Sequence, residues 1–429
     1  MEIFELYSLF NQCDGVSTDT RNILPNSMFF ALKGDNFNAN EFALQAIEKG
    51  AAFAVVDDQN LKKLENNKLI VVPNVLKTLQ ELAAFHRFHI GLPIIALTGS
   101  NGKTTSKELL HAVLSKKYNT IATIGNLNNH IGVPLTLLLI TEDTDIAIVE
   151  MGANHQKEIE LLCKIAQPDF GFITNFGKAH LEGFGGIEGV IKGKSEMYEY
   201  LLENDKTAFV NFDDALQVQK SESINHFGFS MQAHASANVQ INNAFAQPMA
   251  TFQLQNTTIT SQLTGLYNLT NMAFAVCIGT YFNVSLNDIK QAIEEYTPQN
   301  NRSQWVEINN KKILLDAYNA NPSSMKVAIE NFVQLNQNSK TMILGDMFEL
   351  GNEANTEHQQ VIQQVVNANA KAIFVGTHFY DNQIVNNNLQ YFLTLTDLIT
   401  NLQQHVIDAD LILIKGSRGM ALENVLEFL

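Results

Sequence analysis

Ten residues, LTGSNGKTTS (97–106), constrain the fold of this chain more than any other segment. The apolar run IIALT (94–98) leads into their glycines and predicts a buried strand, and the residues that follow predict a helix. A glycine-rich turn between a strand and a helix presents backbone N–H groups and a helix N-terminus to an anion. Lys103 would then reach the terminal phosphates, and the hydroxyl of Thr104 would bind Mg²⁺. We therefore predict an α/β fold with a phosphate-binding loop. The loop residues are Gly99, Ser100, Asn101, Gly102, Lys103, Thr104 and Thr105.

This loop is shorter than the common form of the motif. The first glycine of that form would fall at Leu97, whereas here Gly99 lies only three residues before Gly102. A plain strand-to-helix turn with a solvated lysine is the alternative. The flanking segments favour a nucleotide site, because a strand precedes the loop and the apolar face of a helix follows it. That face consists of Leu109, Leu110, Val113 and Leu114.

The chain of 429 residues is too long for one ordinary hydrophobic core, so we expect several domains. Gly91-Leu92-Pro93 interrupts regular structure, and TPQNNRSQ (297–304) marks a second break. Between the breaks, the apolar runs 94–98, 145–151 and 169–175 predict parallel strands that are buried on both faces. The Thr-rich stretch 245–263 predicts antiparallel strands instead. Alternation of strands and helices resumes after the second break in KILLDAYN, TMILGDM, AIFVGTH and LILIKGS. We predict three domains at 1–90, 91–298 and 299–429.

Composition excludes several classes of function. Lys and Arg number 28 against 44 Asp and Glu, and the net charge of −16 argues against a broad nucleic-acid surface. No apolar run reaches the roughly 18 residues of a membrane helix, and MEIFE at the N-terminus lacks the features of a signal peptide. Cys13, Cys163 and Cys277 have no metal-ligand spacing. We expect a cytoplasmic protein with reduced thiols, no transmembrane segment and no nucleic-acid partner.

Acidic and imidazole side chains follow two of the predicted parallel strands. Glu150 ends the run DIAIVE, and ligands in α/β sheets gather where strands end. Glu150 is therefore a candidate Mg²⁺ ligand beside Thr104, with a solvated strand-end glutamate as the alternative. His180 lies in the glycine-rich loop TNFGKAHLEGFGG after the next strand. A nitrogen ligand there would indicate a second metal position.

Longer motifs in this chain resemble the Mur ligase family, the ATP-dependent amide-forming enzymes of peptidoglycan synthesis. In the central region they are TGSNGKTT, EMGANHQKEIELL, PDFGFITNFGKAHLEGFG and GKSE. VSTDTRNILPNSMFFALKGDNFNANEF near the start and LLDAYNANPSSM, ILGDMFELG and KGSRGMALE near the end extend the resemblance over almost the whole chain. The family architecture that this implies is a small N-terminal α/β domain for the UDP substrate, a central P-loop domain with a parallel sheet, and a C-terminal Rossmann-like α/β domain.

The resemblance also implies roles for single residues. Lys103, Lys194, His180 and Arg302 would be catalytic, and Lys194 in KGKSE falls on the lysine that the family carbamylates. Thr104, Glu150, His180 and carbamylated Lys194 would hold Mg²⁺. The ATP site would add Asn268 and Asn271 from GLYNLTN, Arg302 at the phosphates, Asp316 at the ribose, and Tyr318, Asn319 and Asn321 nearby. Two positions depart from the family pattern: Tyr267 replaces a histidine, and Asn301 replaces a glycine.

Three further groups are implied at the substrates. Ser17, Thr18, Asp19 and Arg21 would lie near the UDP moiety, and Asn128 and Asn129 would line the substrate cleft. Ser417 and Arg418 would contact a substrate carboxylate, although an arginine there could also cap a helix. STDTR could equally be a polar turn.

YNANP together with GDMFELG favours the branch of the family that adds D-alanyl-D-alanine to UDP-N-acetylmuramoyl-tripeptide. The expected reaction uses ATP to form an acyl phosphate, which the amine of the dipeptide then attacks. We expect a monomer whose partners are ATP, the UDP-linked tripeptide and D-alanyl-D-alanine. The third residue of the tripeptide can be lysine or diaminopimelate. Two alternatives remain: an amide ligase of the same fold that adds a diamino acid or extends folates with glutamate, and a P-loop switch that makes no product.

Overall fold

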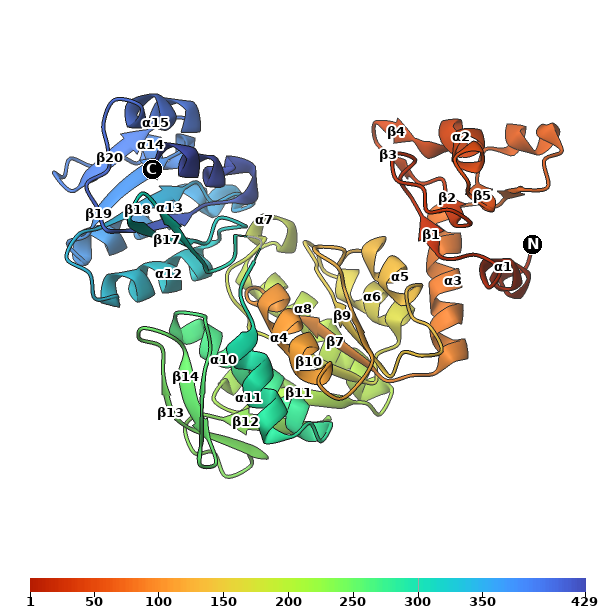
Figure 1. Cartoon of the computed structure of the whole chain (residues 1–429), viewed down its shortest axis with the longest axis horizontal. Helices are drawn as coiled ribbons and strands as arrows, with labels where there is room; N and C mark the ends of the chain where they lie inside the picture. Colours follow the sequence, from red (N-terminus) through yellow and green to blue (C-terminus); the bar gives the residue numbers. More distant parts are fainter. Residues whose placement is uncertain (300) are drawn as a thin grey trace.

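A computed structural model describes residues 1–299 and 301–429 and arranges them around three main sheets (Figure 1). The first unit, drawn in red, has a parallel sheet in the order β1-β2-β5-β6. Alternate residues of its strands face opposite sides, so Phe29 and Phe30 enter different apolar clusters. The strands are β1 (Val16–Ser17), β2 (Met28–Phe30), β3 (Lys33–Gly34), β4 (Phe37–Asn38), β5 (Phe53–Val56) and β6 (Leu69–Val71). The helices are α1 (Ile3–Phe10), η1 (Ala39–Phe42), α2 (Ala43–Glu48) and η2 (Gln59–Leu64).

One long helix, α3 (Val75–Ile90), joins this unit to the next. It packs against α1 on one side and against α5 and α6 of the central unit on the other. Gly91 ends the helix in a left-handed conformation with φ of 70°, which glycine adopts without strain. Arg87 near the end of α3 donates a hydrogen bond of 2.6 Å to Asp169 of the central unit. The predicted break at Gly91 therefore coincides with a helix end.

The central unit contains a sheet of nine strands in the order β15-β14-β13-β12-β11-β10-β7-β9-β8. It is parallel from β13 to β8, and the β13-β14-β15 end is antiparallel, as the Thr-rich stretch predicted. The three predicted parallel strands are confirmed as β7, β9 and β10, with β7 between the other two. The strands are β7 (Ile94–Thr98), β8 (Thr120–Ala122), β9 (Ile146–Glu150), β10 (Phe170–Ile173), β11 (Thr207–Asn211), β12 (Asn225–Ser230), β13 (Val239–Phe245), β14 (Thr251–Leu254) and β15 (Thr257–Thr260).

Helices cover both faces of this sheet. The apolar face predicted for the helix after the phosphate loop is fully buried and packs with α10 in one cluster. Helices α5, α6 and α8 contribute to a different apolar cluster, which the alternate residues Ile94 and Ala96 of β7 join. The helices are α4 (Lys103–Leu114), α5 (Gly132–Leu137), α6 (Glu158–Ala166), α7 (Leu181–Phe184), α8 (Ile187–Glu203), α9 (Ala215–Ser221), α10 (Leu266–Tyr281) and α11 (Leu286–Glu295).

The third unit has a six-stranded sheet in the order β16-β17-β21-β18-β19-β20. Only the edge strand β16 is antiparallel to its neighbour. The strands are β16 (Gln304–Ile308), β17 (Lys311–Leu315), β18 (Lys340–Gly345), β19 (Lys371–Val375), β20 (Leu389–Phe392) and β21 (Leu411–Lys415). The helices are α12 (Pro322–Gln334), η3 (Gly351–Glu353), α13 (Ala354–Asn367), α14 (Thr377–Asp381), α15 (Leu395–Leu402), η4 (Arg418–Met420) and η5 (Leu422–Phe428). The α/β fold class is confirmed.

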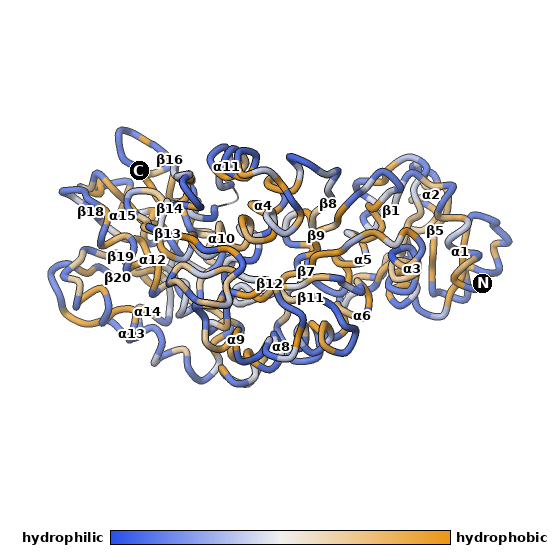
Figure 2. Tube along the Cα trace, turned by 90° about the horizontal axis from the view of Figure 1, so that it is seen from below, coloured by the Kyte–Doolittle hydropathy of each residue, from blue (hydrophilic) through white to orange (hydrophobic). Residues whose placement is uncertain are grey.

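The three units form an elongated molecule with the central sheet in the middle (Figure 2). Apolar residues follow the inner strands, and polar residues follow the outer loops. In the part of the chain that the structure describes, no helix is both long and apolar enough to cross a membrane. Cys163 and Cys277 are buried, Cys13 is half-buried, and all three are free thiols.

Candidate active site

A cavity of about 1030 Å³ lies where the central unit meets the third unit. The carboxyl ends of β7 and β9 open into it, because neighbouring parallel strands end at the same edge of a sheet. Most of the predicted site residues line this cavity. They are Ser100, Asn101, Gly102, Lys103, Thr104, Thr105, Asn128, Asn129, Glu150, His180, Asn268, Asn271, Arg302, Asp316, Tyr318, Asn319 and Asn321.

The loop between β7 and α4 requires its two glycines. Gly99 has φ of 144°, and a Cβ atom there would lie 1.9 Å from the hydroxyl oxygen of Thr174. Gly102 has φ of 78°, and a Cβ atom would lie 2.4 Å from Asn271 Oδ1. Lys103 folds back so that its Nζ donates a 2.7 Å hydrogen bond to the carbonyl of Gly99. Burial lowers the pKa of Lys103, and the nearby Arg302 charge acts in the same direction.

Glu150 and Thr104 meet at the end of β9. Thr104 Oγ1 donates a 3.3 Å hydrogen bond to Glu150 Oε1, and Asn128 Nδ2 donates one of 2.8 Å to the same oxygen. The other oxygen, Glu150 Oε2, is buried and has no partner among the described residues. A buried carboxylate oxygen without a donor is costly, and a cation would satisfy it. The pair therefore fits Mg²⁺, which proteins often hold with one carboxylate, a hydroxyl, water and substrate phosphates.

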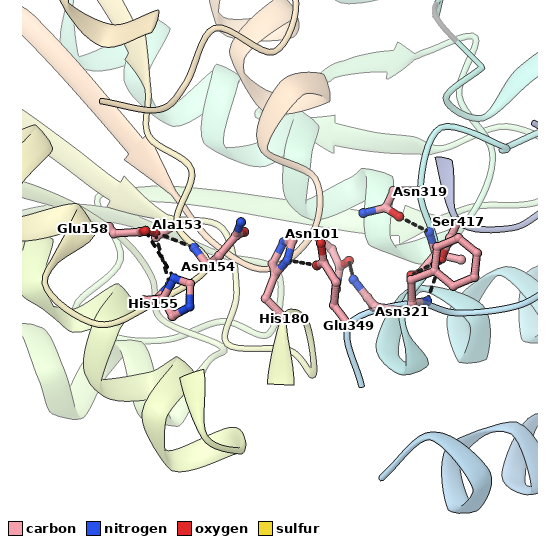
Figure 3. Close-up of polar contacts among 12 residues, drawn as sticks. Asn101, Ala153, Asn154, His155, Glu158, His180, Asn319, Asn321, Glu349 and Ser417 are labelled. Atoms are coloured by element: carbon pink, nitrogen blue, oxygen red, sulfur yellow. Dashed lines mark hydrogen bonds and ion pairs between the residues drawn. The ribbon is translucent and has the colours of Figure 1, made fainter. Parts of the chain in front are cut away.

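His180 is oriented toward the third unit. It directly precedes α7 as the N-cap residue, with φ of 53°, and its Nδ1 contacts the carboxylate of Glu349 (Figure 3). This hydrogen bond holds the pKa of Glu349 below its usual value. Within residues 1–299 and 301–429, no three His, Cys, Asp or Glu side chains form a metal cluster. Glu150 and His180 therefore line the same cavity, but among the described residues they are not part of a cluster of metal-binding side chains.

Lys194 is buried in α8, with 1% of its surface exposed. Its Nζ donates one long hydrogen bond, 3.4 Å, to the carbonyl of Ala153 and lies 5.2 Å from the centre of the Phe184 ring. Burial lowers the pKa of Lys194 well below its usual value, and the charge of Lys103 adds to this effect. The carboxylates of Glu158 and Glu196 act in the opposite direction. Lys194 does not itself line the cavity, but Ala153 does.

The third unit contributes an ion pair that the sequence analysis missed. Lys415 Nζ donates a 2.6 Å hydrogen bond to Asp316 Oδ2, and only 2% of Lys415 is exposed. Asp316 follows β17, and Lys415 ends the neighbouring parallel strand β21. The strand-end argument that singled out Glu150 would have found Lys415 too, since it ends the apolar run LILIK. Arg302 lies nearby, with its guanidinium carbon 3.5 Å from the centre of the Tyr318 ring.

Asn268 and Asn271 support the phosphate loop through protein contacts. Asn271 Oδ1 accepts a 3.1 Å hydrogen bond from Ser106 Oγ, and Asn271 Nδ2 donates one of 2.9 Å to Asn268 Oδ1. Asn268 Nδ2 donates in turn to the carbonyl of Thr264 at 2.8 Å. These buried amides therefore connect α10 to the first turn of α4.

Contacts also cross directly from the central unit to the third. Asn321 Nδ2 donates a 2.7 Å hydrogen bond to Asn101 Oδ1, and Ser323 Oγ accepts one of 2.7 Å from the backbone N–H of Lys178. Lys178 Nζ also pairs with the buried carboxylate of Glu357. The start of α12 is thus in contact with the phosphate loop (Figure 3).

Ser417 and Arg418 lie beside a second cavity of about 170 Å³, next to the first. Ser417 Oγ is buried and accepts a 2.9 Å hydrogen bond from the backbone N–H of Phe348. Arg418 is mostly exposed and pairs with Glu423 at 2.7 Å. Phe348 and Glu349 of GDMFELG complete the wall, together with His180. The motif was recognised in the sequence, but no role for Glu349 was.

The predicted UDP-binding residues lie apart from both cavities. Ser17 is buried, with its Oγ 3.0 Å from Ser27 Oγ, and Thr18 follows it. Asp19 and Arg21 form an ion pair of 2.6 Å, and the Arg21 side chain lowers the pKa of Asp19 to about 2. None of the four lines either cavity. The structure therefore does not bring STDTR to the phosphate loop.

Comparison with known proteins gives a consistent result. Residues 12–87 match the catalytic domain of the Mur ligase family, residues 97–279 match the Mur ligase middle domain, and residues 301–418 match the Mur ligase glutamate ligase domain. The chain is 33% identical to the UDP-N-acetylmuramoyl-tripeptide–D-alanyl-D-alanine ligase of Bacillus subtilis, over 96% of this chain and 92% of that protein. It is 34% identical to the ligase of the same name from Escherichia coli, over 97% and 93%. The crystal structure of MurF from Acinetobacter baumannii superposes with a TM-score of 0.85 at 32% identity, over 96% of this chain and 92% of that one.

Proposed function

The chain belongs to the Mur ligase family, and from this premise we propose that it adds D-alanyl-D-alanine to UDP-N-acetylmuramoyl-tripeptide with the conversion of ATP to ADP and phosphate. One observation carries the proposal. The phosphate loop, Glu150 with its buried oxygen that has no partner among the described residues, and Arg302 from the third unit all line one cavity. Such a cavity suits a nucleotide triphosphate whose terminal phosphate is transferred.

The reaction joins two poor reactants, a carboxylate and an amine. The tripeptide carboxylate attacks the γ-phosphorus of ATP, and the bond to ADP breaks. The amine of the dipeptide then attacks the carbonyl carbon of the acyl phosphate, and phosphate and a proton leave. Both steps bring negative charge together, so positioning and charge neutralisation dominate catalysis.

Residues of two units share this work. Lys103 and Arg302 offset the charge of the phosphates, and Asp316, held by Lys415, accepts from the ribose. Thr104 and Glu150 would hold Mg²⁺, which supplies further charge neutralisation at the phosphates. Asn268 and Asn271 keep the loop in place from behind.

We assign a carbamate to Lys194 within this proposal. The buried amine has one weak hydrogen bond, and its lowered pKa favours the neutral form, which is the nucleophile that adds CO₂. The nitrogen forms a bond to the carbon of CO₂ and releases a proton. The product is an anion with two oxygen atoms near the wall of the cavity that contains Ala153.

The dipeptide fits the second cavity. D-Alanyl-D-alanine carries an ammonium at one end and a carboxylate at the other. Arg418 and Glu349 line this cavity with the opposite charges, and Phe348 offers an apolar surface to the methyl groups. The ammonium end would lie toward Glu349, close to where the two cavities share His180.

The test is the release of ADP from ATP. It is measured with the dipeptide alone, with the UDP-linked tripeptide alone, and with both together. We expect turnover only when the dipeptide and the UDP-linked tripeptide are both present, with the pentapeptide as product. ATP turnover that needs neither substrate would support the switch instead. Turnover with a diamino acid or glutamate but not with the dipeptide would support the related amide ligases. A cytoplasmic location and a monomeric state stay predictions, and both fit an enzyme that takes up three small molecules.

A further inference from the structure

The hydroxyl of Tyr267 connects the central unit to the segment that carries Arg302. Tyr267 lies in the first turn of α10, and its Oη is 2.8 Å from Ser303 Oγ. Ser303 is buried and directly follows Arg302. Burial raises the pKa of Tyr267, so the phenol stays protonated and can share a hydrogen bond with the serine.

The Tyr267 ring lies close to the backbone at Gly265. Gly265 has φ of 94°, and a Cβ atom at that position would lie 2.5 Å from the ring. The ring therefore rests against a backbone that only glycine leaves open. With the ring in this place, the hydroxyl lies within hydrogen-bond distance of Ser303.

The backbone on both sides of Arg302 is strained. Asn301 has φ of 57° and Ser303 has φ of 47°, both in the left-handed region. Such residues cost about 1–3 kcal/mol each and persist only when surrounding contacts hold them. Ser303 has two of these contacts, because its N–H donates a 3.1 Å hydrogen bond to Asp316 Oδ1 and its hydroxyl meets Tyr267.

Arg302 depends on this segment for its direction. Its guanidinium carbon lies 3.5 Å from the centre of the Tyr318 ring, and its Nε is buried without a partner in the described part of the chain. No described residue forms a hydrogen bond or ion pair with the Arg302 side chain, so its direction depends on the backbone of this segment and on the contact with Tyr318. We propose that Tyr267 is a positioning residue that, through Ser303, holds Arg302 in the orientation needed for phosphoryl transfer. This inference rests on the proposed function, because that function assigns to Arg302 the task of offsetting the charge of the phosphates.

The experiment removes one hydroxyl at a time and measures kcat and KM for amide formation. For Tyr267→Phe we expect kcat to fall roughly five- to tenfold, the effect of one neutral hydrogen bond, while KM for the UDP substrate stays within about twofold. Ser303→Ala should give the same loss, and the double variant should lose no more than either single one. Tyr281→Phe, at the other end of α10, is the matched control and should keep wild-type kcat.

A double-mutant cycle of Tyr267 and Arg302 separates a positioning role from a general weakening of the fold. In an Arg302→Ala background, Tyr267→Phe should have no further effect, because the residue through which it acts is gone. Losses that multiply in this background would overturn the inference, as would an unchanged kcat in both Tyr267→Phe and Ser303→Ala. If the wild-type chain makes no pentapeptide at all, the proposed function itself fails, and this outcome is distinct from the other two.

Discussion

Asn321 Nδ2 donates a hydrogen bond of 2.7 Å to Asn101 Oδ1, which joins the start of α12 to the phosphate loop. The same amide does a second task with its oxygen, since Asn321 Oδ1 accepts a 2.9 Å hydrogen bond from Ser324 N and caps the helix. One side chain thus stabilises α12 locally and couples the third unit to the loop. The two tasks can be separated, because they use different atoms.

Asn321→Ser should separate them. Serine is about as good an N-cap as asparagine, so the stability of the fold should change by less than ~0.5 kcal/mol. Its side chain is too short to reach Asn101, so the third unit loses this contact with the loop and kcat should fall. Thermal unfolding and amide formation, measured on the same sample, check both parts. A variant with wild-type kcat would show that the contact with Asn101 has no catalytic value.

The sequence predicted the local parts of the site better than the contacts between units. Strand β9 and its terminal Glu150 followed from a short apolar run, and the buried face of α4 followed from helical spacing. The partner of His180 did not follow, because Glu349 is 169 residues away and lies in a loop of the third unit. No local periodicity reports such a pair.

The same reason explains why the sequence did not predict two further contacts between distant residues. Asn321 was predicted near the nucleotide from its motif, but its bond to Asn101 spans 220 residues and depends on how two units dock. Lys415 was missed although its strand was predicted, since its partner Asp316 lies on a strand that is distant in the chain and adjacent in the sheet. Docking and strand order decide these contacts, and neither is encoded in a short segment.

Gly102→Ala should damage the loop itself. The added Cβ would lie 2.4 Å from Asn271 Oδ1, and φ of 78° is unfavourable for alanine. We expect a loss of stability of about 1–3 kcal/mol together with a loss of ATP binding, because the loop must move away from the amide. Gly34→Ala is the matched control, since its Cβ would meet no atom within 4 Å. Equal stability of the two variants would contradict the requirement for glycine at 102.

His358 should make stability depend on pH. The imidazole is fully buried, its Nδ1 lies 2.6 Å from the carbonyl of Ala354, and its Nε2 accepts a 3.0 Å hydrogen bond from the N–H of Met347. A carbonyl only accepts, so Nδ1 carries the proton and the ring is neutral. Burial lowers the pKa of His358 below the usual value of 6.5.

The sign of the effect follows from this direction. Below about pH 6.5 the unfolded chain takes up a proton that the folded chain does not, so stability falls as the pH falls. Urea unfolding between pH 7.5 and pH 5 (about the range in which an ordinary histidine titrates) measures the slope. His358→Gln should reduce this slope, whereas His405→Gln, at an exposed residue, should leave it unchanged. The buried His86, whose pKa is also lowered by burial, contributes a slope of the same sign. An unchanged slope in His358→Gln would show that folding does not shift the pKa of this imidazole, which contradicts the prediction.

Lys194 offers the sharpest chemical test of the site. An ammonium has three donors, yet Nζ has one acceptor at 3.4 Å and an aromatic ring beside it, so the charged form is poorly satisfied. A carbamate would convert this side chain into an anion with oxygen ligands. Lys194→Ala should therefore lose most amide-forming activity, and added acetate should restore part of it by supplying a carboxylate. Lys194→Arg should not respond to acetate, because the guanidinium fills the space with the wrong charge. Lys192→Ala, two residues earlier on the exposed face of α8, is the control and should keep wild-type activity.

A readout independent of activity is carbon-13 NMR after equilibration with labelled bicarbonate. It should show a carbamate signal in the wild-type chain and in Lys192→Ala but not in Lys194→Ala. Full activity of Lys194→Ala, or the absence of that signal from the wild-type chain, would refute the carbamate.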